Sequence, residues 1–392
     1  MPKKILIAAS NYWNSPYQVG SHHYARVFAK NGWDVLFVSD PISPIHFLVQ
    51  GNEQLRERYK IYKGLYENDI KNIETYVPMA LITPNEKPVF NTRFVAEHWH
   101  NLTIPNIVTY AKKMGFGEVD ILWFDSITQY FWINVIKYRN SVFRLSDKLD
   151  SFKKIGKNAK NLERELMNRV DYIIYTSRVL ETYLKGYEHK MIHISNGVNI
   201  DHFFNASRNI PEDLKHIPEP RAIYVGAIDE WFDIDLLSNV AKNCREISFI
   251  IIGNSRIDLS KLINLSNVFL LGKKDYKEIP AYMYNSNVGI IPFNKNHPIV
   301  QSINPIKLYE YMSCGLPVVA TRWKELEIIK SPAYLADNVN SFIEGLKIAL
   351  QDINKNKYLK FARTNSWDLR YKDVIKFLGN QKHAKIKDFN SK

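Results

Sequence analysis

The chain has 392 residues, of which 45% are hydrophobic and 13% aromatic, so it can bury the cores of two domains and is not disordered. Its formal net charge of +13 indicates an anionic partner, but it does not choose among nucleic acid, a membrane surface and a phosphorylated substrate. The positive charges are spread along the chain, and no zinc-finger spacing or RNA-recognition signature is present. We therefore expect no nucleic acid partner.

The two cysteines, Cys244 and Cys314, provide no disulfide framework, which is typical of a reducing compartment. The apolar run near the N-terminus is too short for a signal peptide, and no stretch is long and apolar enough to span a bilayer. These features predict a cytoplasmic protein.

The first forty residues predict a βαβ unit. We expect strands at 4–10 and 34–39 and a helix at 24–31. The loop before this helix contains Gly20 and His22, and ligands of open α/β sheets bind beyond the carboxyl ends of the strands. His22 is therefore a candidate for contact with an acceptor sugar or a phosphate, with packing at the helix start as the alternative. For His23 we favour packing.

Alternating strands and helices continue after a less regular stretch at 41–119. We expect helices near 43–50 and 92–114 and a strand at 73–77. Further along we expect strands at 121–125, 141–145, 171–175 and 190–194, with helices at 128–138, 158–168 and 178–187. The Asn-Gly-Val-Asn segment at 196–199 then interrupts this series.

Two carboxylates follow strands of this first series. Asp125 ends one predicted strand, and Asp147 lies just past the carboxyl end of another, close in sequence to Arg144 and Lys148. A base needs such a place if it is to deprotonate an acceptor hydroxyl, and a neighbouring cation can keep it ionised. We favour Asp147 as the base, with Asp125, His22 and Asp150 as other candidates. The alternative for Asp147 is that it caps the next helix.

A second series begins after residues rich in proline and polar side chains. The strand at 222–226 ends at Gly226, which permits a ligand to approach the backbone closely. Further strands are expected at 247–252, 268–271 and 288–292, and a basic helix at 358–378. Two series of this kind predict an α/β protein with two doubly wound domains. We place them at 1–205 and 221–355, with a linker at 206–220 and a C-terminal helix and tail at 356–392.

The stretch 304–321 predicts a helix followed by a buried strand. Asn304 suits the N-cap, Gly315 the C-terminal end, and the apolar run after Pro317 an interior parallel strand. Lys307 and Glu310 are one turn apart near the helix start, where free N–H groups and the helix dipole favour a phosphate. The carboxylate of Glu310 suits the vicinal hydroxyls of a ribose. A surface Lys–Glu pair on an ordinary helix is the alternative.

This stretch as a whole resembles the donor-binding segment of GT-B glycosyltransferases, in which a Pro-x-Lys-x-x-Glu-Tyr-Met helix precedes a Gly-x-Pro-Val-Val-Ala-Thr strand. The resemblance implies two Rossmann-like domains facing across a cleft, with the last helix crossing back to the first domain. It also implies that Glu310 holds the ribose and Lys307 the diphosphate, and it extends the donor side to Asn304 and Tyr311. Ser302 stands where many retaining members carry a second acidic residue. The nearest group is therefore the inverting enzymes similar to the bacterial xanthan glucuronosyltransferase (GumK-like).

The resemblance implies transfer of a sugar, with UDP as the preferred nucleotide, to a glycan or lipid-linked saccharide of the bacterial surface. Positive side chains and a helix start can neutralise the leaving diphosphate, and no cluster at metal spacing is present. We therefore expect neither a metal nor another cofactor. A nucleotide-sugar epimerase, a retaining transferase and a non-enzymatic basic binding protein are the alternatives. The net charge, the lack of a spanning segment and a group of basic residues near the predicted site together indicate peripheral attachment to an anionic membrane, with a solvated helix face as the alternative. The basic residues considered for this attachment are Lys112, Lys113, Lys153, Lys154, Lys157 and Lys160.

Overall fold

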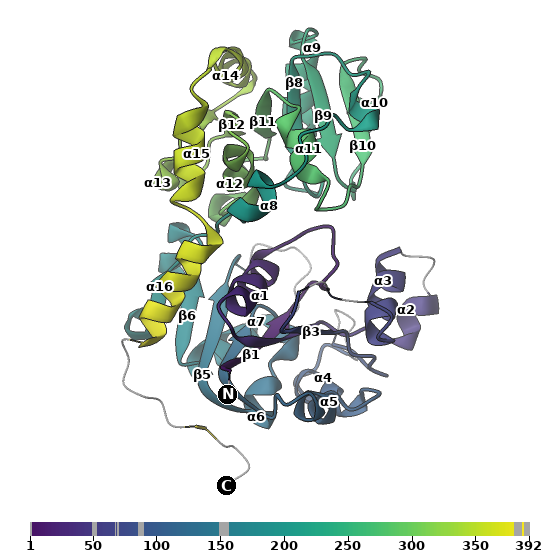
Figure 1. Cartoon of the computed structure of the whole chain (residues 1–392), viewed down its shortest axis with the longest axis vertical. Helices are drawn as coiled ribbons and strands as arrows, with labels where there is room; N and C mark the ends of the chain where they lie inside the picture. The colour runs from purple at the N-terminus through teal and green to yellow at the C-terminus, as the bar shows by residue number, and fades with distance from the viewer. Residues whose placement is uncertain are drawn as a thin grey trace. The chain divides into compact units, whose positions relative to one another are not determined.

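A computed structural model describes residues 2–48, 53–66, 68, 70–84, 90–148, 157–379 and 386–387. The chain divides into two compact units (Figure 1). The first unit comprises residues 1–176, 181–194 and 371–392, and the second comprises residues 177–180 and 195–370. Each unit is built on its own parallel sheet with helices, which confirms the α/β fold class.

The first unit contains a seven-stranded sheet in the order β3-β2-β1-β4-β5-β6-β7, with every neighbouring pair parallel. Its strands are β1 (Lys4–Ala9), β2 (Asp34–Ser39), β3 (Ile73–Tyr76), β4 (Glu118–Phe124), β5 (Lys137–Leu145), β6 (Tyr172–Tyr175) and β7 (Met191–His193). The strand order reverses between β1 and β4. In doubly wound sheets, ligands bind at the carboxyl ends of the strands beside such a reversal.

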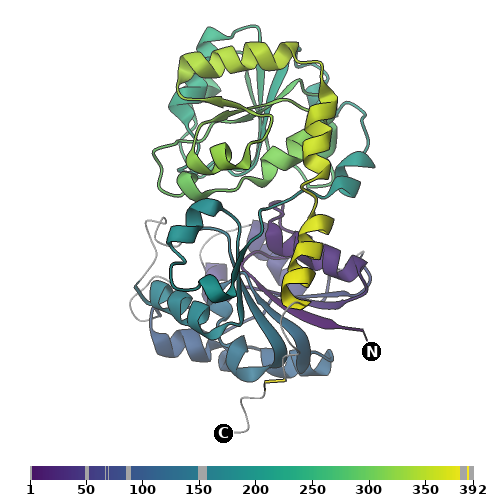
Figure 2. The ribbon, with the colours of Figure 1, turned by 90° about the vertical axis from the view of Figure 1, so that its left-hand side faces the viewer.

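The α-helices associated with the first unit are α1 (Gly20–Lys30), α2 (Pro44–Leu48), α3 (Glu53–Tyr62), α4 (Arg93–His98), α5 (Ile107–Lys113), α6 (Trp132–Val135), α7 (Lys157–Arg169) and most of α16 (Trp367–Gly379). Short 3₁₀ turns are η1 (Trp99–Leu102), η2 (Ile127–Gln129) and η5 (Glu188–Lys190), while η4 (Arg178–Thr182) is divided between the two units. The helix α16 lies alongside α1 in both views (Figures 1 and 2). Tyr371 of α16 contacts Phe28 edge-on at 5.1 Å, and its hydroxyl accepts a 3.1 Å hydrogen bond from Trp33 Nε1. The return of the last helix to the first domain is thus confirmed.

Three helices expected in the first domain differ from the structure, and one of them, at 178–187, forms only the 3₁₀ turn η4 (Arg178–Thr182). The stretch 92–114 is not one helix, because Pro105 cannot continue a helix and a new one begins only after Asn106, which caps it. The stretch 128–138 contains only the short helix α6, because β5 already begins at Lys137 and pairs with β4. The strand expected at 73–77 and the helix at 158–168 are confirmed as β3 and α7.

The second unit contains a six-stranded parallel sheet in the order β10-β9-β8-β11-β12-β13. Its strands are β8 (Arg221–Val225), β9 (Ser248–Ile252), β10 (Val268–Gly272), β11 (Val288–Ile291), β12 (Val318–Thr321) and β13 (Tyr334–Ala336). Its helices are α8 (Ile200–Phe204), α9 (Ile234–Asn243), α10 (Ser260–Ile263), α11 (Ile279–Tyr284), α12 (Ile306–Ser313), α13 (Lys324–Ile329), α14 (Val339–Gln351) and α15 (Lys355–Arg363), with 3₁₀ turns η6 (Glu212–Leu214) and η7 (Val300–Ser302). This sheet reverses between β8 and β11, so the carboxyl ends of these two strands mark the expected ligand site.

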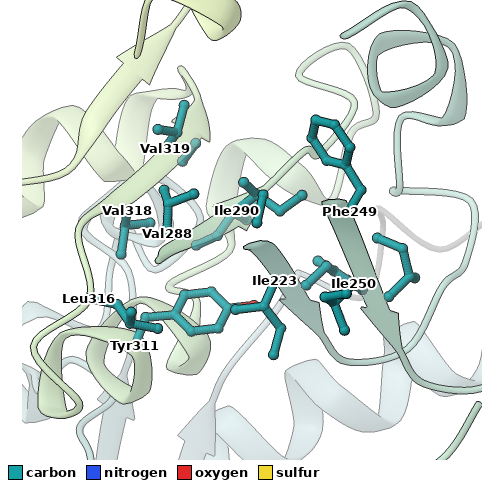
Figure 3. Close-up of a cluster of buried hydrophobic side chains, with 14 of the residues drawn as sticks. Ile223, Phe249, Ile250, Val288, Ile290, Tyr311, Leu316, Val318 and Val319 are labelled. Carbon is teal, nitrogen blue, oxygen red and sulfur yellow. The ribbon is translucent and has the colours of Figure 1, made fainter. Parts of the chain in front are cut away.

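The sheet of the second unit packs its apolar strands against α12 in one continuous core. Figure 3 shows Tyr311 of α12 among strand residues that include Ile223 and Val288. The Tyr311 ring occupies the space beside Gly289, where an added Cβ would lie only 2.5 Å from it, and its hydroxyl accepts a 2.8 Å hydrogen bond from Val225 N. The expected donor-binding role of Tyr311 is therefore wrong, since the side chain is fully buried in this core.

The second unit begins earlier in the sequence than we expected. Residues from 195 onward belong to it, so the expected first domain ends too late. Leu214 and Ile217 of the expected linker are buried in its hydrophobic core. The proline-rich composition of 206–220 therefore marks a packed surface segment and not a free connection.

Candidate active site

The helix–strand segment of the second unit forms as the sequence predicts. The helix α12 ends in a Schellman arrangement, because Gly315 N donates to Met312 O at 3.0 Å and Leu316 N donates to Tyr311 O at 3.1 Å. Gly315 has a φ of +75°, which glycine adopts without strain. Pro317 then separates the helix from β12, and this geometry fixes how α12 presents its first turn.

Asn304 does not cap α12, contrary to expectation. The capping position is Pro305, and the buried Asn304 side chain enters a polar network instead. Its Oδ1 accepts hydrogen bonds from Asn196 N at 3.3 Å and Tyr309 Oη at 3.0 Å, and its Nδ2 donates to Glu325 Oε1 at 3.1 Å. Asn304 therefore stabilises the loop before the helix and does not face a ligand.

Lys307 presents its ammonium group between two aromatic faces. Its Nζ lies 4.6 Å from the centroid of the Phe293 ring and 5.0 Å from that of Tyr224. Throughout the described part of the chain, no carboxylate oxygen comes within 4.0 Å of this ammonium. Burial lowers the pKa of Lys307 to about 8, with the charge of Glu310 opposing that shift. A nearby anion would therefore be attracted by a charge that no protein carboxylate contacts.

Gly226 lies directly against this lysine at the carboxyl end of β8. An added Cβ at Gly226 would come within 3.2 Å of Lys307 Nζ, and the residue has a φ of +146°. Gly253 packs on it in turn, since a Cβ there would lie 1.9 Å from Gly226 O. Glycine is required at both positions, because a side chain would meet Lys307 at the first and the backbone of Gly226 at the second.

Glu310 is half-buried one turn after Lys307, on the same face of α12. Burial raises the pKa of its carboxyl group to about 7, while the Lys307 ammonium and a hydrogen bond from Tyr276 oppose the shift. The Tyr276 hydroxyl donates to Glu310 Oε1 over 3.4 Å. The structure therefore brings an acceptor carboxylate and a cation to the carboxyl edge of β8 and β11.

The first unit places Arg144 and Asp125 together at the carboxyl edge of its sheet. Arg144 Nη1 donates to Asp125 Oδ1 at 3.4 Å and to Ser146 Oγ at 2.6 Å. Gly20 lies against this arginine, since a Cβ there would be 2.2 Å from Arg144 Nη2. Burial raises the pKa of Asp125, and the guanidinium opposes the shift. Asp125 is thus held in a buried ion pair, with both side chains less than a tenth exposed.

Asp147 follows β5 by two positions and is half-buried. Burial raises the pKa of its carboxyl group to about 6, and the charge of Arg144 opposes the shift. The next helix among the described residues is α7, which starts at Lys157. A carboxylate with a pKa near neutrality suits a general base.

His22 is not available to an acceptor. The helix α1 begins at Gly20, so His22 lies in its first turn and its ring is fully buried. Val19 N donates to its Nδ1 at 3.2 Å, and its Nε2 lies 3.0 Å from Tyr12 O. Burial lowers its pKa to about 3. The structure supports the packing alternative, and it also buries His23.

Sequence reasoning missed Asp40, which lies at the carboxyl end of β2. Its Oδ1 accepts hydrogen bonds from Ser126 Oγ at 2.6 Å and Gln129 Nε2 at 3.3 Å. Arg58 Nη2 donates to the carbonyl oxygens of Asp40 and Pro41, and burial raises the pKa of Asp40 to about 6. The sequence could have indicated Asp40, because this carboxylate follows a buried strand just as Asp125 does.

Other expected features cannot be placed or are not found. Asp150, Lys153 and Lys154 lie outside the described residues. Within the residues that the structure does describe, no group of three or more His, Cys, Asp or Glu side chains is arranged to hold a metal ion. Over the same residues, no helix is long and apolar enough to cross a membrane.

Family comparisons match both units of the chain. Residues 6–176 match a model described as the N-terminal domain of glucuronosyltransferase GumK, and residues 219–352 match the model of group 1 glycosyl transferases. TuaH of Bacillus subtilis, assigned as a glycosyltransferase of teichuronic acid biosynthesis, is 27% identical over 258 residues. That match covers 61% of this chain and 64% of the relative, so it spans less than two thirds of the relative's length.

An uncharacterized glycosyltransferase of Methanocaldococcus jannaschii is 24% identical over 216 residues, which cover 50% of this chain and 56% of that protein. Among solved structures, sucrose-phosphate synthase from Thermosynechococcus elongatus superposes with a TM-score of 0.68 at 14% identity, covering 96% of this chain and 99% of the other. Anabaena HepE, solved with UDP and glucose, gives 0.63 at 14% identity, covering 97% and 100%. The first unit is therefore similar to the GumK N-terminal domain and the second to the group 1 glycosyl transferases, and the fold of the chain is that of GT-B glycosyltransferases.

Proposed function

We propose that this protein transfers a sugar from a UDP-sugar to a glycan or lipid-linked saccharide, with inversion at the anomeric carbon and without a metal ion. The observation that carries the proposal is the position of Lys307 and Glu310 at the carboxyl edge of β8 and β11, beside Gly226. The lysine suits a diphosphate, and the carboxylate suits the two hydroxyls of a ribose. Structural relatives solved with UDP favour the same nucleotide.

The leaving diphosphate develops negative charge as the glycosidic bond breaks. Lys307 is the residue that stabilises this charge, and the first turn of α12 adds its dipole. These groups belong to the protein itself, so the proposed transfer uses no metal. Asp147 accepts the proton of the attacking hydroxyl, and Arg144 and Asp125 fix the backbone and charge around it.

Inversion is supported by Ser302, which occupies the position where many retaining relatives carry an acidic residue. Its side chain is buried, and its hydroxyl donates to Ile299 O at 3.2 Å. Such a hydroxyl cannot supply a negative charge to a retaining reaction. Displacement of UDP from the anomeric carbon, by direct attack of the acceptor hydroxyl on the opposite face of the sugar, is the simplest route left to the site.

Replacing Glu310 by alanine tests the donor site. The variant should bind UDP at least tenfold more weakly, about 1.4 kcal/mol, because the ribose hydroxyls lose their acceptor. Isothermal titration with UDP measures this, with Glu344→Ala on the exposed face of α14 as the matched control. Equal affinity in wild type and Glu310→Ala would refute the assignment.

A nucleotide-sugar epimerase is the second candidate, because the same donor site would serve a reaction without an acceptor. The two activities are separated by incubating the protein with UDP-sugars alone and following the sugar by NMR. Interconversion of the sugar without an acceptor would favour the epimerase. Product formation only with a saccharide acceptor would favour the transferase.

We also propose that the protein attaches to an anionic membrane surface. Lys112 and Lys113 are exposed at the end of α5, and α2 exposes Phe47 and Leu48, the latter with 84% of its surface accessible. Each basic residue near an anionic surface contributes about 1 kcal/mol, and exposed apolar side chains add burial.

The protein should therefore sediment with vesicles of mixed phosphatidylglycerol and phosphatidylcholine. It should remain in solution with phosphatidylcholine alone, and binding to the anionic vesicles should weaken as salt is added. Leu48→Glu should bind the anionic vesicles more weakly than wild type does, and its UDP affinity should not change. Equal sedimentation with both lipid mixtures would remove the proposal.

A further inference from the structure

We propose that Tyr276 is a positioning residue of the donor site, which orients Glu310 toward the ribose, and that His202 holds Tyr276 in place. This inference rests on the proposed function, because it concerns the carboxylate that would bind the nucleotide. It begins with the hydrogen bond from the Tyr276 hydroxyl to Glu310 Oε1, which is long at 3.4 Å. Tyr276 comes from the segment between β10 and α11, so the contact joins two separate elements.

The Tyr276 ring is fixed by a stack. The imidazole of His202 lies parallel to it, with ring centroids 4.1 Å apart and an interplanar angle of 5°. His202 Nε2 lies 3.1 Å from the Tyr276 backbone oxygen, so a proton on that nitrogen would hydrogen-bond the same residue. Phe203 adds an edge-on contact to the ring at 6.2 Å. The tyrosine is thus restrained at its ring and at its backbone.

The helix α8 carries His202 to this position. Its N-cap is Asn199, whose side chain accepts a 3.2 Å hydrogen bond from His202 N and so sets the first turn. The helix also packs against α12, which carries Glu310. A chain of contacts therefore runs from Asn199 through His202 and Tyr276 to the carboxylate. Through these contacts, the segment that follows the Asn-Gly-Val-Asn break contributes to the donor site.

The chemistry of the contact explains its use. A tyrosine hydroxyl that donates to one carboxylate oxygen favours the ionised form and fixes the plane of the group. The remaining lone pairs can then accept from the O2′ and O3′ hydroxyls of a ribose. Burial disfavours ionisation of Glu310, so the donated hydrogen bond counts for more here than on an exposed carboxylate.

The test is Tyr276→Phe, which keeps the ring and its stack but removes the hydroxyl. We expect UDP affinity to fall about three- to tenfold, because the carboxylate loses a charge-assisted hydrogen bond. Wild type should prefer UDP over 2′-deoxy-UDP, and the variant should lose most of that preference. Affinity for inorganic pyrophosphate should stay within about twofold of wild type, because Lys307 is untouched.

Tyr282→Phe is the matched control, because Tyr282 also donates its hydroxyl to a carboxylate of this unit, Asp213 Oδ1 at 2.8 Å. It should leave the preference for the 2′-hydroxyl unchanged. A second variant, His202→Ala, should reproduce part of the Tyr276→Phe effect by releasing the ring.

The outcomes separate the two proposals. If wild type binds no UDP, the proposed function fails, and this inference fails with it. If wild type discriminates against 2′-deoxy-UDP and Tyr276→Phe does so equally, only the inference is overturned. A parallel loss of UDP and pyrophosphate in Tyr276→Phe would also overturn it, since that pattern reports general disruption of the site.

Discussion

Asp147→Asn should lower sugar transfer by at least two orders of magnitude while donor binding stays near the wild-type level. A general base contributes about 10²–10⁴-fold to the rate, and asparagine cannot accept the proton of the attacking hydroxyl. In the wild type, burial raises the pKa of Asp147 to about 6, and the base works only when ionised. Turnover should therefore fall as the pH drops through about 6. Steady-state rates between pH 5 and 8, with UDP affinity measured in parallel, check this.

The stability of Asp147→Asn distinguishes a base from a structural carboxylate. A pKa raised by burial means that the folded state favours the protonated acid, so stability is lost as the pH rises through about 6. Asparagine removes this penalty, and the variant should melt no earlier than wild type at pH 8. The control is Asp34→Asn. Asp34 is the first residue of β2, at the amino end of a strand of the same sheet, and this variant should retain turnover. A variant that melts early and keeps its turnover would show that Asp147 is not the base.

The stereochemistry of the product tests the inverting assignment separately. NMR of the first product formed should show the anomeric configuration opposite to that of the donor. Retention of the donor's anomeric configuration would contradict the inverting assignment, whatever the effect of Asp147→Asn. The residues near Ser302 would then be the next to mutate.

Lys307→Met should weaken UDP binding by about ten- to hundredfold. Methionine keeps much of the apolar stem between Tyr224 and Phe293 but removes the charge, and a hydrogen bond to a charged group contributes about 1.5–3 kcal/mol. Burial lowers the pKa of this lysine to about 8. The UDP affinity of wild type should therefore fall as the pH rises through about 8. The UDP affinity of Lys307→Met should not change over this pH range. Titration calorimetry at pH 7 and 9 measures both effects.

Lys324→Met is the matched control for the charge. Lys324 is exposed at the start of α13, and its partner is Glu327 at 4.0 Å. Removing it changes the net charge equally but should leave UDP affinity within about twofold, because exposed pairs contribute little. Equal losses in both variants would mean that Lys307 acts only through the overall field of the protein.

The strands of both sheets could be predicted because most of them are buried on both faces. The runs 35–38 and 288–291 are without polar side chains, and their burial in the structure explains why no alternation is needed. The strand β5 was predicted too short because its first half, Lys137–Asn140, is polar. Pairing with β4 decides its conformation there, and that pairing cannot be seen in a local window.

The residues of the candidate site were predicted less consistently than the strands. Lys307 and Glu310 share a helix face, so local spacing was sufficient to bring them together. Asn304 has the right residue type for a cap, but its partner is Asn196, which is distant in the sequence. Gly20 begins a helix despite its low propensity because the guanidinium of Arg144 fills the space a side chain would need. Contacts of this kind arise only from the tertiary fold.

The return of α16 makes the first unit discontinuous along the gene. A fragment ending near residue 194 would lack Tyr371 and Phe377, which cover Phe28 and Tyr172 with edge-on ring contacts. Those rings would then meet water, and the fragment would be prone to associate. Chimeras that exchange donor specificity among relatives should therefore replace 195–370 as an insert and keep both flanking segments from one parent. The second unit is in this sense an insertion in the sequence of the first.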